Sequence, residues 1–136
     1  MTNSASHVFL YALIALFLAS CASAPLSPAD QAAKADALRA IECGNKATCD
    51  LYWQRAQLWI ARNSSWRIQT ANDVLIQTFG PGNHETTLAY SVVRENHADG
   101  SATIFPKTSC DNMFGCEEVP WRALLKLKSF VTQTQK

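Results

Sequence analysis

Cysteines are the residues of this chain whose chemistry depends most directly on their spacing. Cys43 and Cys49 form one pair and Cys110 and Cys116 a second, and in both pairs five residues separate the thiols. Zinc sites usually place roughly two to four residues between ligands, and redox dithiols are spaced C-x-x-C. Neither spacing occurs here, so we predict no metal and no cofactor. A zinc site that combines all four thiolates is the alternative left open.

Histidine and serine motifs give no stronger indication of catalysis. HETTL, which begins at His84, resembles the start of a zinc-protease motif, but Leu88 stands where the second histidine would be. His97 and Asp99 lie in NHADG, a composition typical of a hairpin turn, which favours a solvated turn over a catalytic dyad. The sequence contains neither a G-x-S-x-G elbow nor a glycine-rich phosphate loop. We therefore predict no catalytic residues and a protein that is not an enzyme.

The N-terminus indicates where the chain is sent. Residues Val8 to Ala19 form an unbroken apolar run with the length of a signal-peptide core. The run is shorter than the roughly 20 apolar residues that span a bilayer. It ends in LASC, residues 18–21, which resembles the lipobox of bacterial lipoproteins. This resemblance implies cleavage before Cys21, a diacylglyceryl thioether on its sulfur and an acyl chain on its new amino group.

Several expectations follow from that resemblance. Residues 1–20 are a lipoprotein signal peptide, residues 21–27 a lipidated tether and residues 28–136 a single small domain. Ala22 stands where an aspartate would favour retention at the inner membrane, which implies sorting to the outer membrane, with the domain facing the periplasm. Several acyl chains on one residue would anchor the domain stably.

Export also changes how the remaining cysteines are interpreted. Disulfides are the default state of paired thiols in an oxidising periplasm. The sequence alone does not decide the pairing, but the equal spacing favours Cys43 with Cys49 and Cys110 with Cys116. Each short loop closed in this way would contribute about 2 kcal/mol to stability.

Charge excludes one class of partner. The chain carries 12 Lys and Arg against 11 Asp and Glu, without a basic stripe. This balance argues against binding to nucleic acid.

Three helices are predicted. The first begins with Ser27 as N-cap and runs to about Glu42, before Gly44. The second spans residues 48–63 and repeats apolar residues at helical spacing, which predicts packing on a sheet. The third spans residues 119–132 and has Pro120 in its first turn.

Between the second and third helices, apolar residues alternate with a period of two, and turn compositions separate the segments. The predicted strands span residues 66–72, 74–79, 86–95 and 101–105. We therefore predict an α+β fold of order ααββββα, a four-stranded antiparallel meander with helices packed on one face. Pro106 cannot donate to a ladder, which places the last strand at an edge.

The loop between Cys110 and Cys116 contains the residues best suited to contact a partner. Met113 and Phe114 at its tip could anchor a partner, because rigid apolar groups bind at low entropic cost. In the alternative, Phe114 folds back and fills the end of the core. The exposure of Phe114 distinguishes the two.

Taken together, the chain resembles small outer-membrane lipoproteins of proteobacteria. Its layout is similar to the helix-grip domains of outer-membrane assembly lipoproteins, a likeness of fold only. We expect a non-enzymatic domain for protein binding or envelope assembly, with the membrane and an envelope protein as partners. The alternative is a carrier of apolar ligands or a hydrolase inhibitor, with a cavity lined by Trp53, Trp59 and Tyr90. A sizeable cavity would favour this alternative.

Overall fold

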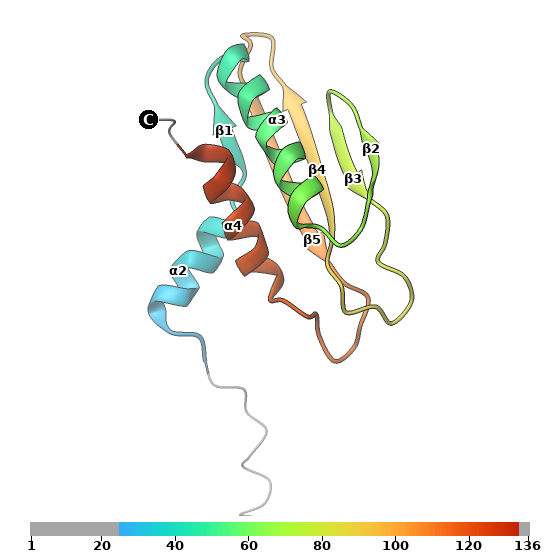
Figure 1. Ribbon diagram of the computed structural model, residues 1–136. Coiled ribbons are helices and arrows are strands. Elements are labelled where there is room, and N and C mark those ends of the chain that lie inside the picture. Colours follow the sequence, from blue (N-terminus) through green and yellow to red (C-terminus); the bar gives the residue numbers. More distant parts are fainter. Residues whose placement is uncertain (1–24, 134–136) are drawn as a thin grey trace, which may run out of the picture.

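The computed structural model describes residues 25–133 and has an α+β fold (Figure 1). One antiparallel sheet has the strand order β1-β5-β4-β3-β2. The helices are α2 (Pro28–Ala37), α3 (Lys46–Asn63) and α4 (Pro120–Thr132). The strands are β1 (Ile41–Cys43), β2 (Ile68–Ala71), β3 (Leu75–Thr78), β4 (Ala89–Asn96) and β5 (Ala102–Ser109).

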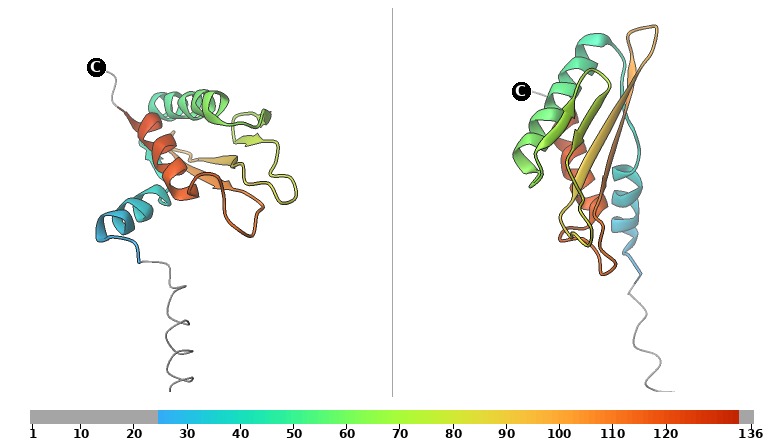
Figure 2. Two further views of the ribbon diagram at one scale, coloured as in Figure 1. Left: turned by 60° about the horizontal axis from the view of Figure 1, so that its bottom comes forward. Right: turned by 90° about the vertical axis from the view of Figure 1, so that its right-hand side faces the viewer.

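Helices α3 and α4 cover one face of the sheet, and the main core lies between these two layers (Figure 2). The core takes its side chains from both helices and from all strands except the edge strand β2, whose Ile68 packs partly against it. Its buried members are Ile41, Trp53, Ala56, Trp59, Ile60, Ile76, Leu88, Tyr90, Val92, Ile104, Ala123, Leu127 and Val131. The α+β class and the antiparallel sheet predicted from sequence are therefore confirmed.

Helix α3 forms where its periodicity predicts a helix. Asn45 is its N-cap, and the Asn45 side chain accepts a hydrogen bond from the Thr48 amide at 2.9 Å. The buried Arg55 of α3 donates from Nη1 to the Val131 carbonyl oxygen at 3.1 Å. This bond satisfies an unpaired carbonyl at the end of α4 and joins the two helices.

The first predicted helix is wrong in length. Ser27 caps α2 as expected, since its side chain accepts from the Asp30 amide at 3.1 Å, but the helix ends at Ala37 instead of continuing to Glu42. Residues 41–43 form strand β1 and pair with β5, so the sheet has five strands and the order αβαββββα. Tertiary pairing overrides helix propensity there, because Ile41 and Cys43 are buried by it.

Helix α2 also departs from the expectation that all helices cover the sheet. It packs on α4 through a small second cluster of Ala37, Trp121 and Leu124. Lys128 of α4 strengthens this contact, because its Nζ donates to the Asp36 carbonyl oxygen at 2.6 Å and to the Asp36 carboxylate at 2.9 Å.

The prediction that the strand before Pro106 is an edge strand is wrong, although Pro106 itself has an edge environment. Strand β1 pairs with residues 102–104 of β5 and leaves the half that holds Pro106 without a strand on its outer side. The His97 amide donates to the Ser101 carbonyl, so the backbone N–H and C=O groups of odd-numbered β5 residues point towards β4. The backbone nitrogen of Pro106 therefore points away from β4. The missing N–H therefore removes no bond to β4.

Both disulfides pair as expected. Cys43 and Cys49 join β1 to the start of α3 across a Cα–Cα distance of 5.3 Å, and Cys110 and Cys116 close the loop before α4 across 5.7 Å. Within residues 25–133, no helix is both long and apolar enough to span a bilayer.

Candidate functional site

Two loops lie against each other at one end of the domain, and we call residues 82–87 and 110–117 the paired-loop tip. The Cys110–Cys116 disulfide closes the second loop. Three hydrogen bonds to backbone carbonyl oxygens join the loops. The Asp111 amide donates to the Glu85 carbonyl at 3.1 Å, the Glu117 amide to the Thr86 carbonyl at 2.9 Å, and Asn112 Nδ2 to the His84 carbonyl at 2.6 Å. The tip is thus cross-linked covalently and by hydrogen bonds.

Met113 and Phe114 project from this tip into solvent. Their exposed fractions are 86 % and 92 %, the highest among the exposed large apolar residues of the described chain. The Phe114 amide donates to Asn112 Oδ1 at 2.9 Å, and Gly115 follows with a φ of 109° that favours glycine. Phe114 therefore lies at the surface, and the alternative in which it fills the core is wrong.

The charge of the paired-loop tip has one sign. Glu85, Asp111 and Glu117 are exposed on these two loops, which contain no Lys or Arg. An apolar pair beside three carboxylates is complementary to an apolar pocket with a basic rim. The tip also lies at the same end of the domain as the start of α2, where the described chain begins (Figure 1).

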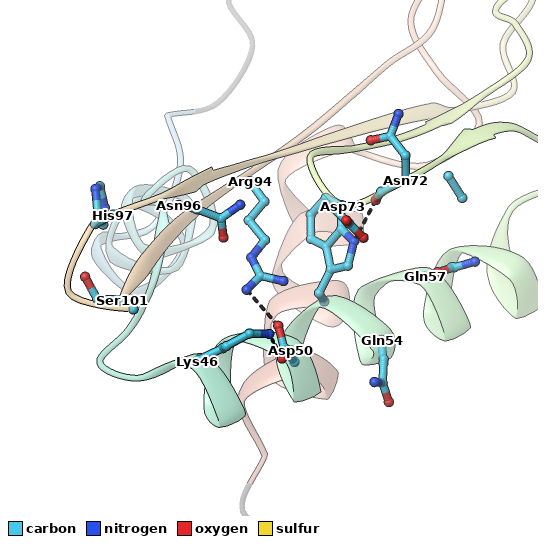
Figure 3. A pocket seen from close by; sticks show the side chains of 13 residues that line it. Lys46, Asp50, Gln54, Gln57, Asn72, Asp73, Arg94, Asn96, His97 and Ser101 are labelled. Carbon is cyan, nitrogen blue, oxygen red and sulfur yellow. Dashed lines mark hydrogen bonds and ion pairs between the residues drawn. The ribbon is translucent and has the colours of Figure 1, made fainter.

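A second candidate is a polar pocket of about 640 Å³ at the other end of the domain. It lies between α3, the β2–β3 turn, the end of β4 and the turn that follows β4 (Figure 3). Its walls include Lys46, Asp50, Trp53, Asn72, Arg94 and His97. Most of these side chains carry hydrogen-bonding groups, so the pocket suits a polar ligand.

Arg94 is the most unusual residue of this pocket. Its side chain is only 8 % exposed, and Nη2 donates to Asp50 Oδ1 at 2.9 Å. Lys46 lies 2.6 Å from the other oxygen of the same carboxylate. Hydrogen bonds from Lys46 and then Arg94 hold the pKa of Asp50 below its ordinary value, so Asp50 is ionised at neutral pH.

The aromatic residues expected to line an apolar cavity, Trp53, Trp59 and Tyr90, all pack in the main core, and Trp53 also forms part of the wall of the polar pocket. Trp59 and Tyr90 meet edge to face with ring centroids 5.6 Å apart. Trp53 donates from Nε1 to the backbone carbonyl oxygen of Asn72 at 2.9 Å. Burial, with a smaller contribution from Glu118, raises the pKa of Tyr90 to about 12.

The two histidines of the sequence motifs lie in different loops, His84 in the paired-loop tip and His97 in the turn between β4 and β5. His84 is an exposed loop residue with a φ of 62°. Asp99 accepts hydrogen bonds from the Ser101 amide at 2.9 Å and hydroxyl at 2.6 Å, which lower its pKa, while His97 Nε2 lies 3.1 Å from Thr103 Oγ1. Within residues 25–133, no group of three or more His, Cys, Asp or Glu is arranged to hold a metal ion.

Cys21, the predicted lipidation site, lies outside the described residues.

Sequence reasoning missed Arg94 and the contact between the two loops of the tip. The alternation of β4 offered a signal for Arg94, because it follows the buried Tyr90 and Val92 on the inward-facing positions. The loop contact left no signal in the sequence.

Comparisons with protein-family models, curated proteins and solved structures gave no match.

Proposed function

We propose that this protein is a non-enzymatic, lipid-anchored domain of the bacterial cell envelope that binds a protein partner through the paired-loop tip. Its anchor is Cys21, in the lipobox-like sequence LASC, and its location is the outer membrane, facing the periplasm. Two disulfides in a small domain fit an oxidising compartment outside the cytosol.

The observation that carries the binding proposal is the exposure of Met113 and Phe114 on a cross-linked loop. Two large apolar side chains in water favour transfer into a partner's apolar pocket, at about 1.5 to 3 kcal/mol for each side chain fully buried. Because the disulfide and the hydrogen bonds already order the loop, little conformational entropy is lost on binding.

The chemistry of the tip also limits the partner. Its exposed Glu85, Asp111 and Glu117 would repel an acidic surface and attract a basic rim around an apolar pocket.

The short tether limits how far the domain can lie from the membrane. Cys21 precedes Pro25 by four residues, which span at most about 14 Å when fully extended. A lipid on Cys21 would therefore keep the tip end near the membrane, so the partner surface is close to the membrane as well.

Photocrosslinking in cells tests the binding proposal. A photoreactive phenylalanine analogue is placed at position 114 and, as a control, at the exposed Val74 in the β2–β3 turn. We expect one discrete protein adduct from position 114 and none from position 74. The Glu117→Lys variant, which reverses one charge on the paired-loop tip, should weaken that adduct. Equal adducts from both positions, or none from position 114, would contradict the proposal.

Mass spectrometry of the membrane fraction tests the anchor separately. The N-terminal peptide should begin at Cys21 and carry the mass of its acyl chains, and Cys21→Ala should release the domain from the membrane. A protein that keeps residues 1–20 and carries no acyl mass would refute the anchor, whatever the outcome at position 114.

A further inference from the structure

We infer that the polar pocket between α3 and the sheet binds a ligand through a free carboxylate group, with Arg94 as the anchoring residue. The elements that line this pocket include the first turns of α3, the β2–β3 turn and the β4–β5 turn, which lie at the opposite end of the domain from the paired-loop tip (Figure 1). The inference is therefore independent of the function proposed for that tip.

Arg94 has unused hydrogen-bonding capacity. Its side chain is more than nine-tenths buried, yet Nη2 to Asp50 is its one hydrogen bond within residues 25–133. Nε is fully buried and has no partner among those residues. Buried polar groups are nearly always satisfied, and a guanidinium offers five donors. Its Nη1 also lacks a partner there and is not among the fully buried atoms, which leaves it available to the pocket.

Asp50 lies between two positively charged side chains. This single carboxylate pairs with both Lys46 and Arg94, so the three groups carry a net charge of one positive unit. Lys46 is solvated at the pocket mouth, whereas Arg94 is removed from water. A buried cation that shares its counterion with a second cation is costly, and one additional negative charge would neutralise these three groups. A carboxylate supplies one such charge and matches the planar guanidinium fork.

The remaining walls favour a ligand with amide groups. Gln54, Gln57, Asn72 and Asn96 line the pocket and offer both donors and acceptors. Figure 3 shows Arg94 reaching from β4 towards Asp50 on α3, whereas Asn72 and Asp73 lie on the side of the pocket formed by the β2–β3 turn. Asp73 adds a negative charge on that side, which would reject a second carboxylate there. A short peptide with a free C-terminus, or a simple monocarboxylic acid, fits this arrangement.

Titration of the full-length chain in detergent tests the inference. The probes are N-acetyl-Ala-Ala with a free carboxylate, the same dipeptide as its C-terminal amide, and acetate. The readout is the NMR signal of the Arg94 Nε–H group. We expect a saturable shift with the acid and none with the amide. Binding of the dipeptide alone identifies a peptide terminus, whereas equal binding of acetate identifies any small carboxylate.

Matched variants connect the response to the pocket. Arg94→Gln should weaken binding at least about tenfold, because the charged hydrogen bonds to the ligand are lost. Lys46→Ala keeps the buried core intact and should weaken binding several-fold. Lys126 is the control, since this exposed lysine also lies 2.6 Å from a carboxylate but on α4, and Lys126→Ala should leave binding unchanged.

Two results would overturn the inference. One is the absence of a saturable response to both the dipeptide acid and acetate in the unaltered chain. The other is binding that does not depend on the carboxylate or on Arg94, seen as equal binding of the acid and its amide or as equal binding by the unaltered chain and the Arg94→Gln variant. In either case Arg94 and Asp50 would only hold α3 to the sheet.

Discussion

Removing the two disulfides one at a time should separate the effect of loop closure from the effect of burial. Both bridges join cysteines with a sequence separation of 6, so the chain entropy that they remove from the unfolded state is the same. For a loop of this size the term is about 2 kcal/mol. Any difference between the two variants must therefore come from the folded state.

The surroundings of the two bridges differ clearly. Cys43 and Cys49 are buried with Ala102 in a cluster of their own, whereas Cys110 and Cys116 are only partly buried beside the main core. Replacing two buried sulfur atoms by hydrogen leaves a void, at about 1 kcal/mol for each atom. We expect the Cys43→Ala, Cys49→Ala variant to lose about 4 kcal/mol and the Cys110→Ala, Cys116→Ala variant about 2 to 3 kcal/mol.

Urea unfolding followed by circular dichroism measures both losses. The slope of free energy against urea should stay equal in the two variants, so that the midpoints report stability directly. A loss of the same size in both variants, or a larger loss at Cys110 and Cys116, would refute the argument from burial. A changed slope in one variant would place the difference in the unfolded state instead.

Two further predictions concern other parts of the core. The Tyr90 pKa is raised from 10.0 to about 12, so the unfolded state ionises first, and the stability present below pH 10 should fall by about 2 kcal/mol as the pH rises to 12. Urea unfolding at several alkaline pH values measures this loss, and a Tyr90→Phe variant that shows the same loss would contradict it. Gly80→Ala should cost about 2 to 4 kcal/mol, because φ is 72° and the new Cβ would lie 2.5 Å from the Trp66 ring. Gly44→Ala is the matched control, since a Cβ there meets no atom within 4 Å, and thermal unfolding should distinguish the two variants.

The candidate sites differ in how much of them a sequence can reveal. Met113 and Phe114 could be singled out because two cysteines delimit a short loop that contains them. Their exposure, and the second loop that carries His84 and Glu85, depend on contacts between segments far apart in the chain. The Arg94 pocket depends even more on tertiary structure, because a helix, a turn and two strands each supply part of its wall.

The sequence by itself determined the elements whose signal is local. The apolar stripe of α3, the alternation of β4 and the equal cysteine spacing each lie within one segment, so periodicity and spacing predict them. Only the tertiary structure decided the short strand β1, since three residues carry almost no periodic signal and become a strand only where Ile41 meets Ile104. The same holds for Pro106 and Arg94, because hydrogen-bond direction and burial are set by neighbours that the local sequence does not contain.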